Sequence, residues 1–397
     1  MAVRRIVYKR ERIVPVRFSR CAAAVPANTY APDPDDRGYT GYHGPVVGVC
    51  RDDRARIRVL RDLLDPNAPL YVTSEDPSKL QIRVPAAGQP LPGGGHADIE
   101  FVTAGDTGDV KVQVRAQAAD GPIVAELTVH ISRVTTIRCA AHRTAIYAPP
   151  GPRSAANTTT RSFAGMRALI AEVNRQWRPA GISFNVDTWK DDTNLTNQVP
   201  RNGVNPVDGI LLCPIYGTSP PTPNENFDRL MNTNKVANRL NIYFVRQIQA
   251  PPDPATGVAP NYIGFGSSSQ VGLVVSDNLG DLETEAHTVS HELGHILTLA
   301  GSGHATVNDS HSDDDPRFDI TVANRRHDLW SRRRLMYYMV GLQAADRTGS
   351  GGRYSFAGTD AGYGEGRSGH MITIKNLTGD PTDNEYTDAR NKARTLP

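Results

Sequence analysis

The sequence predicts a multidomain protein in which an all-β sandwich is followed by an α+β domain. Its 397 residues are long for a single domain, so two domains are expected. Apolar and polar residues alternate over 97–132, which is the period of half-buried strands. From about residue 141, helical and strand patterns follow one another. We therefore divide the chain into an irregular Pro-rich segment (1–45), a β-sandwich (46–135) and an α+β domain (141–397).

Composition argues against several classes of protein. The net charge of +2 provides no general attraction for nucleic acid or an anionic membrane. No apolar run approaches the roughly 18 residues that a membrane span requires. The basic N-terminus lacks the apolar core of a signal peptide, so we expect any export or delivery to use a non-classical route. The four cysteines contain no C-x-x-C pair, which argues against a cysteine zinc site and leaves free thiols and disulfides both open.

The β-sandwich rests on a series of short strands. Val110, Val112 and Val114 alternate with polar residues, and a turn at 119–121 leads to the same pattern over 127–131. Further strands are expected at 97–103, 70–73 and 80–84. In the spacing of its strands and turns, the segment resembles bacterial immunoglobulin-like (Ig-like) modules. That resemblance implies a β-domain that docks on a partner.

In the α+β domain, apolar residues at helical spacing predict a helix over 162–177, which Pro179 and Gly181 end. Three strands are then expected, at 182–189, 240–245 and 271–276. We take the last of them as an edge strand. Pro/Asn/Gly-rich loops are expected between these elements, notably over 199–226 and 250–270.

A further helix, from an N-cap at Asp281 to about residue 300, carries the sequence HELGH. Residues four apart point the same way on a helix, so His291 and His295 can bind one metal ion. Glu292 is offset by one position and can reach a water on the metal, as the general base of zinc-dependent hydrolysis must. His287 lies about 12 Å along the helix from His295, too far to share a tetrahedral ion, and is expected to be a neighbour of the site.

Catalytic zinc takes three protein ligands and leaves the fourth position open. Gly301 and Gly303 allow a turn after the helix, and His304 follows nine residues after His295. We expect His304 to be the third ligand, with His311 as its rival. The acidic run 313–315 is a weaker rival; it is expected to be a solvated loop, where a structural Ca²⁺ is an open alternative.

The pattern resembles the metzincin clan of zinc peptidases, in which HExxHxxGxxH or HExxHxxGxxD is followed by a tight turn with a methionine beneath the metal. His291, Glu292 and His295 match this motif, and Met336 matches the turn methionine. Tyr338 matches a tyrosine that some members use as an extra ligand or to stabilise the oxyanion. The segment 383–393 corresponds to the clan's C-terminal helix. Thr298 replaces the motif glycine, three further residues precede His304, and a Gly-rich insertion (348–369) follows Met336.

The resulting hypothesis is a zinc-dependent endopeptidase that acts on a protein or peptide substrate. Two alternatives remain open: an adhesion or binding protein with a metal-stabilised, inactive second domain, and a peptidase toxin delivered into another cell. Retention of Glu292 argues against an inactive site, because a purely structural metal needs no base.

Overall fold

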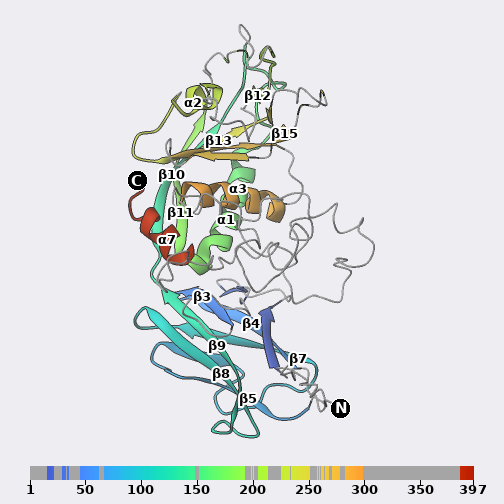
Figure 1. Ribbon diagram of the computed structural model, residues 1–397, viewed down its shortest axis with the longest axis vertical. Helices are drawn as coiled ribbons and strands as arrows, with labels where there is room; N and C mark the ends of the chain where they lie inside the picture. Colours follow the sequence, from blue (N-terminus) through green and yellow to red (C-terminus); the bar gives the residue numbers. More distant parts are fainter. Residues whose placement is uncertain are drawn as a thin grey trace, which may run out of the picture.

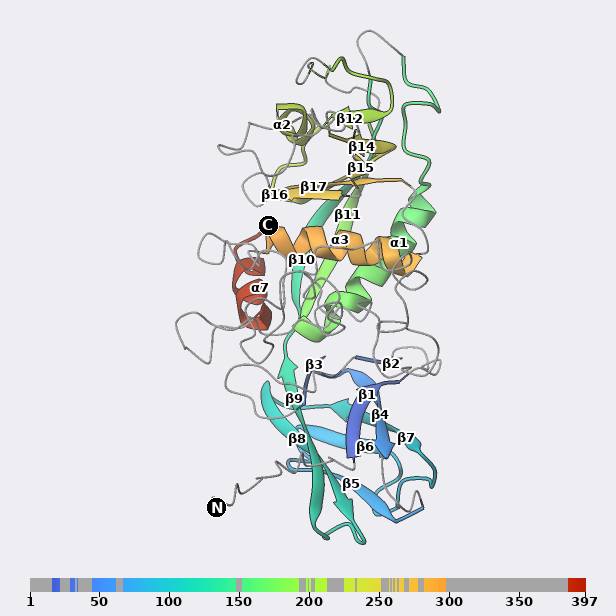
Figure 2. The ribbon, with the colours of Figure 1, turned by 45° about the vertical axis from the view of Figure 1, so that its right-hand side comes forward.

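The computed structural model describes residues 16–21, 29–32, 34, 45–61, 67–147, 152–192, 198, 200, 204–212, 225–232, 234–250, 257, 259, 261–262, 264–267, 271–277, 282–297 and 385–397. Two regions are stacked along the long axis of the molecule (Figures 1 and 2). The first consists of strands and the second combines a sheet with helices. The prediction of a multidomain, β-rich protein is confirmed at this level.

Nine of the described strands form two sheets in the first region. They are β1 (Val16–Arg20), β2 (Thr29–Tyr30), β3 (Val46–Cys50), β4 (Arg54–Arg61), β5 (Leu70–Ser74), β6 (Leu80–Val84), β7 (His96–Thr103), β8 (Gly108–Ala116) and β9 (Ile123–Ser132). One sheet has the order β1-β4-β7-β6, with β2 on β4, and the other has the order β3-β9-β8-β5. Side chains of both sheets, among them Ile57, Phe101 and Val129, share one apolar core, so the sheets pack face to face.

The expectation of irregular structure throughout residues 1–45 is wrong for two short segments. β1 pairs antiparallel with β4, and β2 pairs parallel with the start of β4. Val16 and Phe18 are buried, whereas Arg17 between them is exposed, so β1 begins with the alternation of a half-buried strand, although Ser19 is buried as well.

The second region is built on a five-stranded sheet with the order β11-β10-β13-β17-β16. Its strands are β10 (Thr135–Arg143), β11 (Ile182–Asp191), β13 (Leu240–Val245), β16 (Gly264–Ser267) and β17 (Gly272–Ser276). All adjacent pairs are parallel except β16 and β17, which are antiparallel. A smaller sheet contains β12 (Ile210–Leu212), β14 (Gln247–Gln249) and β15 (Asn261–Tyr262).

Helices cover both faces of the five-stranded sheet. α1 (Phe163–Trp177) and α3 (Leu282–Ile296) lie on one face, and α2 (Glu225–Asn232) lies with the smaller sheet on the other (Figure 2). α7 (Glu385–Ala393), at the end of the chain, packs beside β10. α1 begins at Ser162, whose side chain accepts a hydrogen bond from the backbone of Gly165, and ends in a 3-10 turn, η1 (Arg178–Ala180).

A polar joint connects the two regions at η1. Arg178 makes two hydrogen bonds of 2.6 Å to the Asp53 carboxylate, which holds the pKa of Arg178 above its usual range. Burial raises the pKa of the Cys50 thiol to about 12, so it stays protonated and donates to the Arg178 carbonyl at 3.1 Å. Gly181, at φ 72°, touches the first region, because a Cβ there would lie 2.4 Å from Ser132 Oγ. The regions therefore meet in close contact.

Candidate metal centre

The HELGH sequence lies on α3, as predicted. The apolar side of this segment explains why it forms a helix. Ala286, Val289, Leu293 and Ile296 recur at helical spacing and are fully buried in the core beneath the sheet. The helix is continuous from Leu282 to Ile296. Positions 291 and 295 therefore lie one turn apart on the same side of an unbroken helix, as two ligands of one ion require. The side chains of His287, His291 and His295 lie outside the described part of the structure.

Glu292 lies directly beneath β16. The residue is 9% exposed. A Cβ added at Gly264 would lie 2.8 Å from Glu292 Cγ and 3.3 Å from Oε1. One added at Gly266 would lie 2.6 Å from the Glu292 carbonyl oxygen and 3.3 Å from Oε2. The two glycines let the strand rest on Glu292, so its carboxylate is held between α3 and the sheet.

β16 also corrects the expected edge of the sheet. The predicted strand 271–276 is β17, which lies between β13 and β16 and is internal. β16 is the outer strand, and among the described strands it pairs with β17 alone. Its glycines face α3, while Phe265 between them packs edge-on against Phe227 of α2, with ring centres 4.7 Å apart.

Two polar contacts hold α3 against its neighbours. Ser290, next to His291, donates a 2.7 Å hydrogen bond to Gln176 of α1, and both side chains are buried. Arg161, just before α1, forms a 2.7 Å ion pair with Glu285 of α3. Sequence reasoning misses both contacts because the partners are more than 110 residues apart in the chain.

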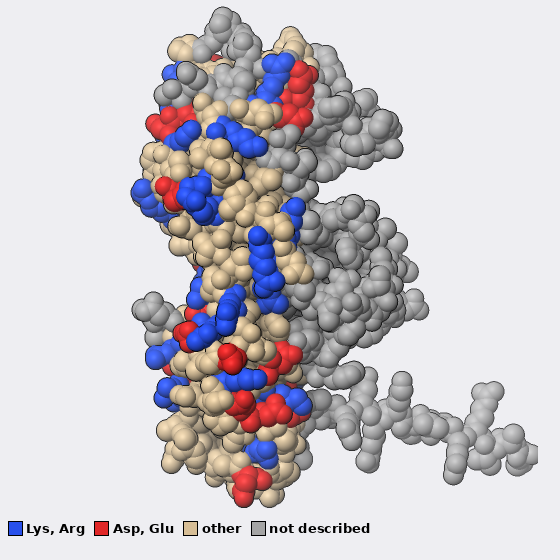
Figure 3. Space-filling model, turned by 90° about the vertical axis from the view of Figure 1, so that its left-hand side faces the viewer, with Lys and Arg blue, Asp and Glu red and all other residues tan. Residues whose placement is uncertain are grey.

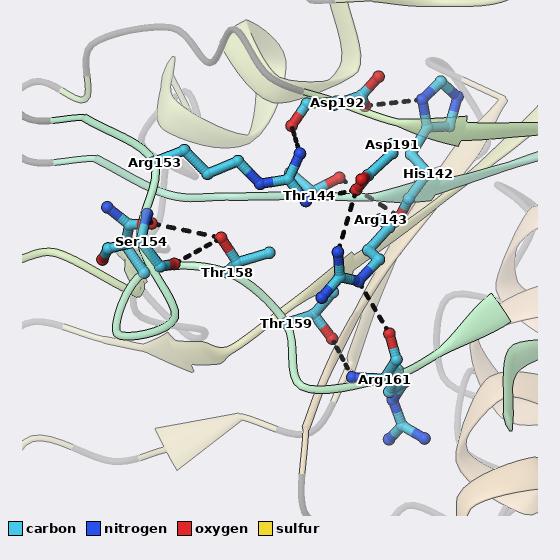
Figure 4. Close-up of polar contacts among 11 residues, drawn as sticks. His142, Arg143, Thr144, Arg153, Ser154, Thr158, Thr159, Arg161, Asp191 and Asp192 are labelled. Atoms are coloured by element: carbon cyan, nitrogen blue, oxygen red, sulfur yellow. Dashed lines mark hydrogen bonds and ion pairs between the residues drawn. The ribbon is translucent and has the colours of Figure 1, made fainter.

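A second polar cluster surrounds His142 of β10, which is fully buried (Figure 4). Its Nδ1 lies 2.8 Å from an Asp192 carboxylate oxygen, and its Nε2 lies 2.9 Å from Asn241 Oδ1. Asn241 Nδ2 donates to two backbone carbonyls and Oδ1 accepts from Val236 N, which fixes the orientation of the amide. Nε2 must therefore carry a proton, and a second proton is shared between Nδ1 and Asp192. The ring stacks on Tyr243 at 4.3 Å, and burial raises the pKa of that phenol.

The remaining predicted site residues, His304, Met336 and Tyr338, lie outside the described residues, as do the rival ligand His311 and the acidic run 313–315. Within the described part of the chain, no three His, Cys, Asp or Glu side chains form a group that could bind a metal. Among the described residues, Cys21, Cys50 and Cys139 form no disulfide. The helices described include none long and apolar enough to cross a bilayer.

No protein-family model matches the chain, and no curated protein matches it at a significant level.

Proposed function

We propose that the protein is a zinc-dependent endopeptidase whose second region is a metzincin-like catalytic domain. The observation that carries the proposal is the position of Glu292. Its carboxylate is held against β16, on the helix on which positions 291 and 295 are one turn apart. α1, β11, β13, β17 and α3 occur in the chain order that the sequence resemblance implies, with other elements between them, which supports the same assignment.

In this proposal a zinc ion would be bound by three histidines. His291 and His295 would supply two imidazole ligands from successive turns of α3, and His304 the third, with His311 as its rival. Met336 would lie beneath the metal. Zinc bound there would supply Lewis acidity, which polarises a carbonyl and makes a water acidic enough to attack at neutral pH.

Glu292 would act as general base by taking the proton of the attacking water and returning it to the leaving amine. A base must be close to the proton that it removes. The contact of Glu292 with Gly264 and Gly266 leaves its carboxylate little freedom to move. Tyr338 would stabilise the negative charge that develops on the carbonyl oxygen.

β16 would hold the substrate. Within the described structure this strand hydrogen-bonds to a neighbour on one side only, so an extended peptide can add to its other side. β16 is thus the edge strand that would bind the substrate, in place of residues 271–276. The peptide would then pass close to Glu292. The first region would be an Ig-like module that docks on a target or a delivery apparatus.

The test compares the wild type with Glu292→Gln in zinc content and in cleavage of casein and a peptide library. We expect full zinc occupancy and a loss of kcat/KM of about 10²–10⁴-fold. Glu225→Gln, an exposed glutamate on α2, is the control and should cleave normally. Zinc-loaded Glu292→Gln with wild-type cleavage would refute the mechanism. Zinc content of His304→Ala and His311→Ala identifies the third ligand, because only one of them should lose the metal.

A further inference from the structure

Arg161 makes contacts at the point where β17 ends and α3 begins. Its Nη1 donates to Glu285 Oε2 at 2.7 Å, and its Nη2 donates to the Ser276 carbonyl at 3.0 Å. Its Nε lies 3.6 Å from an Asp277 carboxylate oxygen. The guanidinium also lies 5.8 Å from the centre of the Phe244 ring. One side chain thus connects β13, the end of β17 and the first turn of α3.

The backbone of Arg161 is held as firmly as its side chain. Its carbonyl accepts a 3.0 Å hydrogen bond from Arg143 Nε, and its N–H donates to Thr159 Oγ1 at 3.3 Å (Figure 4). Asp277 in turn accepts from Thr160 N at 2.6 Å and from Thr160 Oγ1 at 2.8 Å. Its side chain is 2% exposed. Arg161 therefore contacts α3 from a fixed base.

The contact with α3 constrains how the helix is turned. Glu285 lies seven residues before Glu292, which is about two turns and 10.5 Å along the same side of the helix. Burial of the apolar side chains beneath α3 is non-directional and does not by itself define the rotation of the helix about its axis. An arginine–carboxylate pair, in contrast, has a defined geometry. A small rotation of α3 would move the Glu292 carboxylate away from Gly264 and Gly266.

We propose that Arg161 is a positioning residue, which acts through Glu285 to set the rotation of α3 and so the placement of Glu292 against β16. The proposal rests on the proposed peptidase function for its kinetic consequence. Its structural consequence, a fixed α3, does not depend on that function.

The test uses the full chain and four variants. Glu285→Gln removes the negative charge that Arg161 contacts on α3, but it keeps the contacts of Arg161 with Asp277 and with the Ser276 carbonyl. Arg161→Ala removes the side chain, and Arg161→Lys keeps a charge that can reach one partner at a time. Arg167→Ala is the control, because Arg167 lies six residues further along, on α1, and stacks on Trp189 of β11 with its guanidinium 4.8 Å from the ring centre.

We expect Glu285→Gln and Arg161→Ala to lower kcat about 10- to 100-fold with KM within twofold of wild type. Arg161→Lys should recover part of that loss. The acid limb of the pH profile, which reports the general base, should shift in the two damaged variants and stay in place in Arg167→Ala. Unchanged kcat and acid limb in folded Glu285→Gln would overturn the kinetic claim. Because Glu285→Gln retains the anchor of Arg161, it tests the idea even if Arg161→Ala does not fold.

Hydrogen exchange gives a readout without catalysis. The amides of α3 should exchange faster in Glu285→Gln than in wild type, while those of α1 should not change. Unchanged exchange in α3 would overturn the positioning role. A wild-type protein that neither binds zinc nor cleaves peptides would instead refute the proposed function, and the exchange result would still decide whether Arg161 fixes the helix.

Discussion

The core between the two sheets of the first region is built from apolar side chains, and ion pairs such as Arg58–Asp98 lie nearer to solvent. The second region buries polar groups within its fold, among them His142 with Asp192 and Ser290 with Gln176. Basic and acidic side chains are interspersed over the face shown in Figure 3. Buried polar contacts are directional and costly to break, whereas apolar packing tolerates small shifts. The second region is therefore the one in which the geometry of the elements is specified most tightly.

The strongest test of this comparison removes His142. In His142→Ala, Asp192 stays buried and loses its ring partner, so we expect the free energy of unfolding to fall by about 3–5 kcal/mol. Urea unfolding at neutral pH measures the change. The control is Lys111→Ala, which breaks the half-exposed Lys111–Glu126 pair of the first region and should cost less than about 1 kcal/mol. Equal effects of the two substitutions would contradict the comparison.

A smaller effect is expected where the two regions meet. Asp53→Asn removes the charge that Arg178 contacts and should lower stability by about 1–2 kcal/mol. Because this contact joins the regions, calorimetry should show their unfolding becoming less cooperative, with a broader or divided transition. Asp52→Asn is a matched control, since Asp52 is the neighbouring residue and its side chain is 71% exposed. If Asp52→Asn and Asp53→Asn behave alike, the Arg178 contact does not join the regions.

The smallest effect concerns a pair of the first region. Hydrogen bonds from Arg58 hold the pKa of Asp98 below its usual range. The pair therefore stabilises the fold above the unfolded-state value near 3.9, and this contribution is lost as the pH falls through the lower folded-state pKa. Asp98→Asn should lower stability by less than about 1 kcal/mol at pH 6, and the difference from wild type should shrink towards pH 3. Urea midpoints across this range measure it, with the exposed Asp120→Asn as control. A difference that does not depend on pH would rule out the pair as its source.

The sequence predicts best the elements whose pattern is local. The buried positions of α1 and the apolar side of α3 follow helical spacing, and both helices are present. β4 is not among the expected strands, although its arginines alternate with the buried Ala55, Ile57 and Val59 at the period of a half-buried strand. β10 lies between two parallel neighbours. Its sequence contains Ala and Cys, which are weak indicators of a strand.

The elements of the candidate site that escape prediction depend on long-range contacts. β16 contains Gly264 and Gly266, and glycine disfavours strands, so its sequence resembles a loop. The glycines are explained only by Glu292, which lies against them from a helix further along the chain. Arg161, Asp277 and Glu285 likewise form no local pattern, because Arg161 is more than 110 residues from the other two.

The close contact between the two regions at Arg178 and Gly181 limits how far the first region can move relative to Glu292. β9 ends at Ser132 and β10 starts at Thr135, so the chain passes from one region to the other with almost no slack. A target bound by the first region would therefore be held at a fixed distance from Glu292. Only a segment of that target lying at this distance from the bound part could reach β16 and Glu292. If the proposed function holds, lengthening the connection after Ser132 should change which bonds of a target bound by the first region are cut, whereas cleavage of short free peptides should be unchanged.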